Sequence, residues 1–258
     1  MRLFIKLSYN GRNYNGWQVQ LGQPSVQAEL ERALTVWFRE PVQVTGAGRT
    51  DSGVHAINYI AHFDLASDSM TLWEEQQKTI FKINAILPTD IVVSNIWQVP
   101  EDAHARFDAF SRTYKYYVHS EKSSFLTDYS YFHPYKLDLE KMNRAAAFII
   151  GEHDFTSMAK LHTDVKNNIC TVTNAVWKKG SPFSFEDGDS YQFTITANRF
   201  LRNMVRAIVG TMLEIGRDRQ EAEWIIDVLD KKDRSSAGSS VPAHPLFLTD
   251  IEYPKYKL

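Results

Sequence analysis

The chain has 258 residues, of which 43% are hydrophobic and 23% charged, so it is long enough to bury the core of one large domain or two small ones. No apolar run reaches the roughly 20 residues that span a bilayer, the N-terminus lacks the features of a signal peptide, and a single cysteine, Cys170, excludes an internal disulfide framework. The net charge of −2 means that a nucleic-acid partner would need locally clustered basic residues. We therefore expect a cytoplasmic protein.

The first hundred residues alternate between strand and helix patterns. Leu3, Ile5 and Leu7 fall on one side of a strand, and Ser25 is the expected N-cap of a helix. The predicted elements are a strand at 2–9, a helix from Ser25, strands at 42–45 and 59–65, a helix at 71–86 and a strand at 90–99. This β–α–β–β–α–β order is typical of a ferredoxin-like arrangement.

The order partly recurs in the rest of the chain. The predicted elements there are strands at 112–119, 170–179, 191–197 and 246–253, and helices at 138–150, 200–215 and 219–229. Residues 120–136 have no clear period, and residues 231–245 form a polar loop. We predict an α/β (α+β) fold of two similar ferredoxin-like or RRM-like halves, 1–105 and 106–258, joined around a mostly antiparallel central sheet with a catalytic cleft between them.

A glycine-rich loop, GAGRTDSGVHA at residues 46–56, lies between two predicted strands. It is not a phosphate-binding loop, because no Gly-Lys-Ser/Thr follows, and its glycine spacing does not fit a dinucleotide site. Asp51 and Arg49 are its notable residues. Asp51 fits either an Asx-turn or a carboxylate kept ionised by arginines and available as nucleophile or base.

His55, at the end of the same loop, has two interpretations. It could act as a general base, but a lone histidine beside a strand is more often structural. A Ser-His-Asp triad of Ser52, His55 and Asp51 is not expected, because the three are crowded into one loop without a Gly-x-Ser-x-Gly elbow.

Three arginines mark the predicted helix near residue 200. Arg199, Arg202 and Arg206 have the spacing i, i+3, i+7, which places them on one stripe of a helix. Such a stripe suits phosphate contacts or a carboxylate partner, and the alternative is an ordinary solvated face. Arg206 lies where the helix becomes apolar all round, so its charge needs a partner. We hypothesise that this partner is Asp51.

Basic and aromatic residues interleave from His104 to Tyr117. This pattern suits RNA, because bases stack on aromatic rings while phosphates contact arginine and lysine, although this segment alone slightly favours a plain amphipathic strand. The RNP1 pattern of an RNA-recognition motif is absent. Neither Cys-x-x-Cys nor His-x-x-x-His spacing occurs, so the sequence predicts no metal site.

Five segments together resemble the tRNA pseudouridine synthase A family, along nearly the whole chain. They are GRTDSGVHA at 48–56, HARFDAFSRTYKYYV at 104–118, GEHDFTS at 151–157, NRFLRNMVRAIVGTMLEIG at 198–216 and AHPLFLTDIEYP at 243–254. Asn58-Tyr59 stands where Gly-Gln is common, and Pro245 where glycine is usual.

The resemblance implies a reaction and a set of residues. Uridines at positions 38, 39 and 40 of the tRNA anticodon stem-loop would become pseudouridine, with Asp51 as nucleophile, Arg206 paired with it and Tyr114 packed on the target base. Arg49 is expected at the substrate. Arg106, Arg112, Arg199 and Arg202 are the candidate RNA-binding residues. The resemblance also implies a homodimer that needs no metal or organic cofactor.

Two other functions remain possible from the residues alone. The first is a non-catalytic RNA-binding protein on the same fold, and the second is a hydrolase that uses Asp51 with His55. The sequence also leaves open whether Asp51 attacks the base, attacks the sugar or abstracts a sugar proton. It does not say which tRNAs are substrates.

Overall fold

The computed structural model describes residues 1–66, 75–160, 167–183 and 189–256. The chain forms two compact units. Unit 1 comprises Met1–Phe110 together with Leu248–Leu258, and unit 2 comprises Ser111–Phe247. The sequence had instead suggested halves at 1–105 and 106–258. The difference at the C-terminus arises because the last strand hydrogen-bonds within unit 1, where Asn58 Nδ2 donates to Thr249 O over 2.9 Å.

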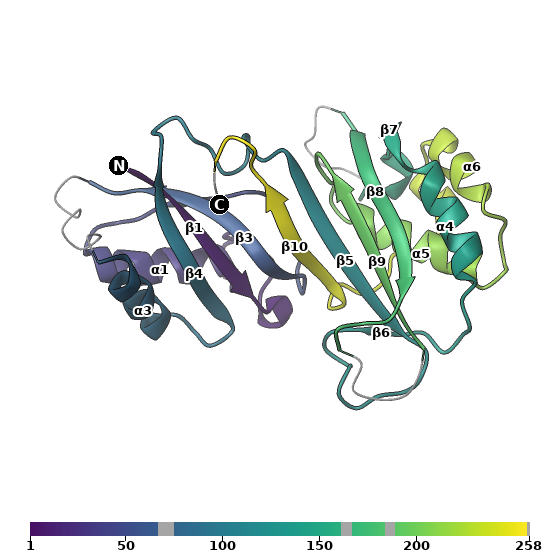
Figure 1. Ribbon diagram of the computed structural model, residues 1–258, viewed down its shortest axis with the longest axis horizontal. Coiled ribbons are helices and arrows are strands. Elements are labelled where there is room, and N and C mark those ends of the chain that lie inside the picture. Colours follow the sequence, from purple (N-terminus) through teal and green to yellow (C-terminus); the bar gives the residue numbers. More distant parts are fainter. Residues whose placement is uncertain (67–74, 161–166, 184–188, 257–258) are drawn as a thin grey trace. The chain divides into compact units, whose positions relative to one another are not determined.

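Unit 1 has the predicted β–α–β–β–α–β order (Figure 1). Its elements are β1 (Arg2–Tyr9), α1 (Val26–Phe38), β2 (Val44–Gly46), β3 (His55–Asp64), α3 (Gln76–Ile86) and β4 (Ile91–Val99). β1 is antiparallel to both β3 and β4, and β2 is antiparallel to β3. β10 (Leu246–Glu252) also pairs with β3. The helices α1 and α3 contact each other, and α3 packs on β4.

The local signals in unit 1 act as expected. Ser25 Oγ accepts a hydrogen bond from Ala28 N over 3.3 Å and caps α1. The alternating residues of β1 are buried, and Phe4 on the opposite side of the strand is buried too. β1 is therefore covered on both faces. The first four residues of the predicted helix at 71–86 lie outside the described residues, and the helix that is described begins at Gln76.

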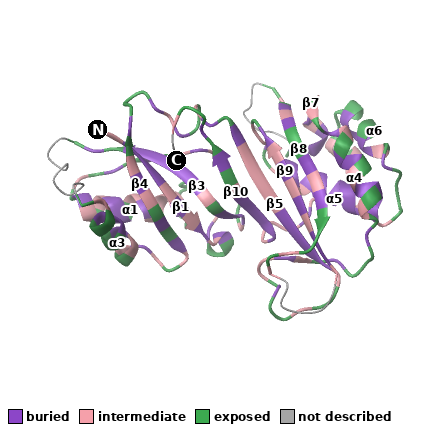
Figure 2. Cartoon of the chain, in the orientation of Figure 1, coloured by how far each residue is buried: buried purple, intermediate pink, exposed green. Residues whose placement is uncertain are grey.

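Unit 2 contains a second mostly antiparallel set of strands, in the order β5-β9-β8-β7, with helices packed against it (Figure 1). Its elements are β5 (Ser111–His119), β6 (Tyr131–Phe132), α4 (Leu139–Phe148), β7 (Gly151–Asp154), β8 (Ile169–Lys179), β9 (Ser190–Ala197), α5 (Met204–Gly216) and α6 (Trp224–Lys231). β6 pairs with β5 in parallel. α4 contacts β8 and α5. Figure 2 shows that α5 is buried along most of its length.

The mixed α/β fold with mostly antiparallel strands is thus confirmed, while several boundaries differ. α5 begins at Met204 rather than at 200, because Asn203 has a left-handed backbone with φ 68° and cannot lie inside a right-handed helix. β3 begins at His55 rather than at 59, so it follows the glycine-rich loop closely. The short strands β6 and β7 were not predicted. Within the described residues, no helix is long and apolar enough to cross a membrane.

Candidate active site

Asp51 lies in the loop between β2 and β3 of unit 1 and is half-buried. Backbone hydrogen bonds hold this loop near Asp51. Trp17 N donates to Thr50 O over 3.4 Å, Gly53 N donates to Tyr14 O over 3.3 Å, and Val54 N donates to Asp51 O over 3.2 Å. The backbone of Asp51 is therefore fixed on both sides by the segment that follows β1.

A buried aromatic cluster packs against the same loop. It consists of Tyr9, Trp17 and Tyr59. The Trp17 and Tyr59 rings stack with centroids 4.1 Å apart, and the Tyr9 ring meets Tyr59 edge to face at 5.6 Å. Tyr9 Oη and Thr50 Oγ1 share a buried hydrogen bond of 2.9 Å. The Tyr59 hydroxyl donates to Gly48 O. Gly48 and Thr50, the two neighbours of Arg49, are thus tied to the buried aromatic cluster.

Glycines make this close packing possible. Gly16 has φ 88°, and a Cβ there would lie 2.2 Å from Thr50 O. A Cβ at Gly46 would lie 2.1 Å from the Tyr59 hydroxyl. A Cβ at Gly11 would lie 2.0 Å from Val54 O. Only glycine fits these three positions without displacing the loop. The segment Gly11–Trp17, which contains none of the predicted site residues, is therefore a structural support of the Asp51 loop.

His55 is buried, and its Nδ1 accepts a hydrogen bond from Gly11 N over 3.1 Å. This contact ties β3 to the segment after β1, and it favours the structural interpretation of His55 over the general-base one. Ser52 Oγ donates to Tyr14 O over 3.3 Å, so it is also oriented toward that segment. Neither contact has the pattern of a nucleophile activated by a histidine.

Arg49 and Arg106 are the exposed arginines predicted for the site in unit 1. Arg49 lies in the Asp51 loop, two residues before the carboxylate. Arg106 places its guanidinium 5.6 Å from the centre of the exposed Phe107 ring. An arginine beside an exposed ring is a surface that suits stacked bases and phosphates.

Arg206 lies in the first turn of α5 in unit 2 and is half-buried. Its Nε donates to Val241 O over 2.7 Å, and Val241 N donates to Arg206 O over 3.3 Å. One turn later, a Cβ at Gly210 would lie 1.8 Å from Ser239 O, so the chain around Ser239 passes directly over α5. This packing fixes both the backbone and the guanidinium of Arg206.

Arg199 and Arg202 are not on the helix, which corrects the prediction of a single helical stripe. Both precede α5, in the connection from β9. Arg202 is exposed and Arg199 is half-buried. The i, i+3, i+7 spacing therefore does not place these arginines on one helix face. Arg199 and Arg202 could contact RNA only from a loop.

Tyr114 lies on β5 opposite Ile195 of β9 and is half-buried. Its ring meets Phe200 edge to face, with centroids 5.0 Å apart and an interplanar angle of 84°. Arg112, two residues earlier on the same strand, donates from Nη1 to Asn198 O over 2.8 Å. Tyr114 and Arg112 are thus both braced by the connection that leads into α5.

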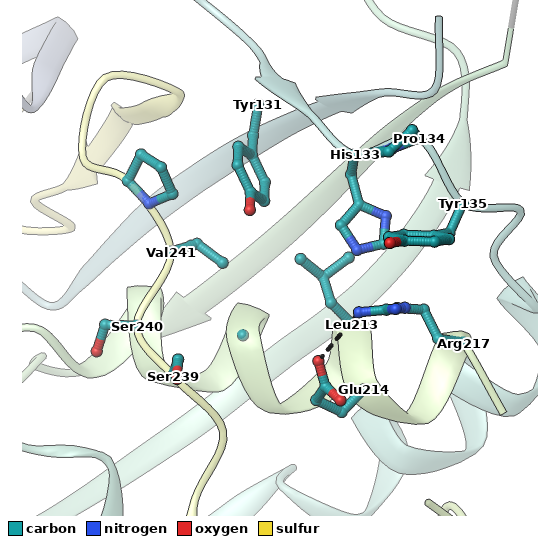
Figure 3. Close-up of a pocket in the computed structure, with 12 residues that line it drawn as sticks. Tyr131, His133, Pro134, Tyr135, Leu213, Glu214, Arg217, Ser239, Ser240 and Val241 are labelled. Atoms are coloured by element: carbon teal, nitrogen blue, oxygen red, sulfur yellow. Dashed lines mark ion pairs between the residues drawn. The ribbon is translucent and has the colours of Figure 1, made fainter. Parts of the chain in front are cut away.

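Unit 2 also contains a cavity of about 200 Å³, beyond the C-terminal half of α5 (Figure 3). Tyr131, His133, Tyr135, Glu214 and Arg217 contribute to its walls. The Arg217 guanidinium stacks 3.8 Å from the Tyr135 ring and pairs with Glu214 at 3.5 Å. None of the predicted site residues lines this cavity, but Val241, whose carbonyl accepts a hydrogen bond from Arg206 Nε, does.

The predicted site residues fall into two groups. Asp51, Arg49 and Arg106 belong to unit 1, and the remaining five belong to unit 2, namely Tyr114, Arg112, Arg199, Arg202 and Arg206. The pairing of Asp51 with Arg206, and the cleft between the halves, stay predictions. Among the described residues, no group of three or more His, Cys, Asp or Glu side chains could hold a metal ion.

A family model described as tRNA pseudouridine synthase matches residues 145–254. A tRNA pseudouridine synthase A from Parabacteroides distasonis is 49% identical to this chain, over 98% of the chain and 96% of the relative. The chain belongs to the tRNA pseudouridine synthase A family. Relatives of the same name from Bacteroides thetaiotaomicron and Bacillus subtilis are 49% and 38% identical, over 98% of this chain and 91% and 99% of their own lengths.

Membership of this family fixes the class of reaction. The protein is an isomerase that converts uridine to pseudouridine in tRNA. The resemblance seen in the sequence is thereby confirmed at the level of family, substrate class and reaction.

Proposed function

We propose that this synthase modifies uridines at positions 38, 39 and 40, on the 3′ side of the tRNA anticodon stem-loop, and that Asp51 is its nucleophile. The observation that carries the proposal is the construction of the Asp51 loop. A carboxylate stands on a backbone fixed by Trp17 and Tyr14 and supported by a buried aromatic cluster. Such preorganisation is what a group that must meet one atom of a bound nucleoside requires.

The reaction rearranges bonds without adding or removing atoms. The glycosidic bond from N1 of the uracil to C1′ of the ribose breaks, and a bond from C5 to C1′ forms. The proton on C5 is lost, and N1 gains one. An aspartate can assist by attacking the base, by attacking C1′, or by removing a sugar proton, and all three roles need an ionised carboxylate in a site that excludes water.

Arg206 is proposed to pair with the Asp51 carboxylate. Its Nε is already engaged by Val241 O. The rest of the guanidinium can pair with a carboxylate, because arginine presents five donors in a fixed plane. Tyr114 is proposed as the wall against which the extruded uracil packs, with Phe200 holding the tyrosine ring in place.

The other arginines are proposed to bind the RNA backbone. Arg49 lies nearest to Asp51 in sequence and is assigned to the target nucleotide. The exposed Arg106 and Arg202, with Arg112 and Arg199, are assigned to phosphates of the stem-loop. We further propose that the enzyme works as a homodimer in the cytoplasm, with one tRNA contacting both subunits.

Substitution of Asp51 tests the proposal. Unmodified tRNA transcripts with uridines at 38–40 would be incubated with wild type, Asp51→Ala and Asp51→Asn, and pseudouridine would be mapped at each position. We expect product from wild type and a loss of about 10³-fold or more in both variants, because a nucleophile acts at every turnover. Asp227→Asn, on α6 of unit 2, is the matched control.

Two results would contradict the proposal. Undiminished product from Asp51→Ala would exclude Asp51 as the nucleophile. Binding of tRNA by wild type without product at any of the three positions would remove the positional assignment and favour a non-catalytic RNA-binding role there.

A further inference from the structure

A narrow loop at residues 18–23 projects an apolar side chain from unit 1. Leu21 is fully exposed, with a relative exposure of 103%. It occupies the first corner of a tight turn, in which Gln23 N donates to Gln20 O over 3.1 Å. Gly22 takes the second corner with φ 71°, a conformation that favours glycine. The turn therefore places Leu21 at the very tip of the loop.

The base of this loop is rigidly built. Asn15 N donates to Pro24 O over 2.9 Å, and Gln27 N donates to Trp17 O over 3.0 Å. Gln20 Nε2 donates to Asn15 O over 3.1 Å. The first two bonds cross from one arm of the loop to the other, and the third braces the arm that precedes the tip. The tip is consequently held in one place by the backbone and does not depend on packing of Leu21 itself.

The same loop is tied to the loop that carries Asp51. Asn15 Nδ2 donates to the side-chain oxygen of Gln23, and the Ser52 hydroxyl proton is shared between Tyr14 O and Asn15 Oδ1, the latter over 3.4 Å. Trp17 N donates to Thr50 O. Asn15 and Trp17, which precede the tip, are thus bonded to the residues on either side of Asp51, and Gln23, which follows the tip, is bonded to Asn15. The tip and the carboxylate belong to one rigid piece of unit 1.

We propose that Leu21 is a wedge that enters the base stack of the tRNA beside the target uridine and holds the stack open while that uridine occupies the active site. The inference rests on the proposed role of Asp51. A uridine paired in a stem must leave its stack to reach a carboxylate. Apolar side chains that enter between base steps are a known physical means of unstacking a helix.

The chemistry of the loop favours RNA bases over RNA phosphates as its contact. No charged residue occurs between Arg12 and Glu29 in the sequence. The tip offers the apolar side chain of Leu21, and the loop also carries the exposed side chain of Val19 and the exposed amides of Gln18, Gln20 and Gln23. Amides can hydrogen-bond to base edges and ribose hydroxyls, whereas a phosphate-binding loop would carry lysine or arginine. Insertion of Leu21 would also remove its whole side chain from water.

The test compares a paired target with an unpaired one. Two transcripts would carry the same target uridine, one opposite its pairing base and one opposite an abasic residue. For Leu21→Ala and Leu21→Gln we expect kcat/KM to fall about tenfold on the paired target and less than about twofold on the unpaired target. Leu21→Met, which keeps an apolar side chain of similar size, should retain wild-type activity on both.

Val36→Ala is the matched control, because Val36 is an exposed apolar residue on α1 of the same unit. Equal losses on both targets, or no loss on either, would overturn the wedge. A change of oligomeric state in Leu21→Gln would also overturn it, since the tip would then contact a second copy of the chain. Failure of the Asp51 proposal is separate, because it shows as full activity of Asp51→Ala on both targets.

Discussion

The residue next to the proposed nucleophile is part of its anchor. Thr50 is buried, and its hydroxyl shares a hydrogen bond with Tyr9 Oη, from a residue 41 positions away in the sequence. The motif around Asp51 could be recognised from the sequence because its residues are contiguous. Tyr9 and Tyr59 could not be assigned to the site in the same way. An aromatic residue in a predicted strand is expected to be buried, but the sequence does not indicate which loop it will contact.

Tyr9→Phe should show how much activity depends on the exact position of the Asp51 carboxylate, because it leaves Asp51 itself in the chain. The change leaves the ring in place and leaves the buried hydroxyl of Thr50 without this partner. We expect a cost of about 1–2 kcal/mol in the free energy of unfolding. We also expect kcat to fall by about tenfold with KM nearly unchanged, because misplacing a reacting group affects the chemical step more than binding.

Steady-state kinetics and thermal unfolding would be measured for Tyr9→Phe beside Tyr256→Phe. The Tyr256 hydroxyl donates to Asp108 Oδ2 over 2.8 Å, so the control removes a similar hydrogen bond that does not involve the Asp51 loop. Equal reductions of kcat in the two variants would show that Tyr9 has no particular role in positioning.

At the scale of elements, hydrophobic periodicity predicted most helices and strands. It gave wrong boundaries where a residue with positive φ ends the regular backbone. The apolar pattern of α5 extends back to Leu201, while the helix starts at Met204 because Asn203 is left-handed. A single residue with positive φ leaves no trace in hydrophobic periodicity. β6 has two residues and β7 four, which is too short for a period of two to be recognised.

A buried histidine on β3 gives unit 1 a predictable response to acid. His62 Nδ1 accepts a hydrogen bond from Ala105 N over 3.1 Å, and the His104 ring lies 4.7 Å away. Burial, with a smaller contribution from the charge of Arg2, lowers the pKa of His62 to about 4. The ring therefore stays neutral in the folded protein at pH values where it is protonated in the unfolded chain.

The sign of the pH effect follows from that difference. Because the folded pKa lies below the unfolded value of about 6.5, the unfolded state binds more protons, and stability falls as the pH drops from about 6.5 toward 4. Between pH 7 and pH 5 we expect this group to cost about 2 kcal/mol in the free energy of unfolding.

Urea unfolding of wild type and His62→Asn at both pH values would measure this cost. The asparagine keeps an acceptor for Ala105 N but cannot ionise, so the variant should lose less stability on acidification. His104, whose pKa is also lowered chiefly by burial, would supply a remaining part of the pH dependence. An identical loss in the two proteins would show that His62 is not responsible.

For the whole molecule, the net charge of −2 does not describe the surface that would meet RNA, because basic side chains attract phosphates locally. Exposed arginines proposed to contact RNA occur in both units, with Arg106 in unit 1 and Arg202 in unit 2. Binding of tRNA should therefore weaken steeply with salt, since each neutralised phosphate releases counterions.

A single arginine substitution should change that salt dependence by a measurable step. We expect Arg202→Gln to weaken tRNA binding and to reduce the slope of log affinity against log salt by about 1. Arg144→Gln, an exposed arginine on α4, is the matched control and should leave the slope unchanged. Filter binding or fluorescence anisotropy at several salt concentrations would give both slopes. A slope that is the same for Arg202→Gln and wild type would exclude a phosphate contact.

The division of the molecule was only partly predictable. The recurrence of strand and helix patterns indicated two halves, and the structure has two compact units. The alternation of residues 246–253 predicted a strand, but the pattern of a strand does not say which neighbour it will pair with. The return of Leu248–Leu258 to unit 1 could therefore not be deduced from the sequence.

That return has a consequence for how the enzyme is made. A ribosome releases residues 1–110 first, then all of unit 2, and only afterwards the strand that pairs with β3. Until then, the part of β3 near Asn58 lacks its hydrogen-bonding neighbour and presents an open edge. Unit 1, which carries the proposed nucleophile, is thus the first unit to be synthesised and the last to be completed, and a nascent chain stalled inside unit 2 cannot yet contain a complete unit 1.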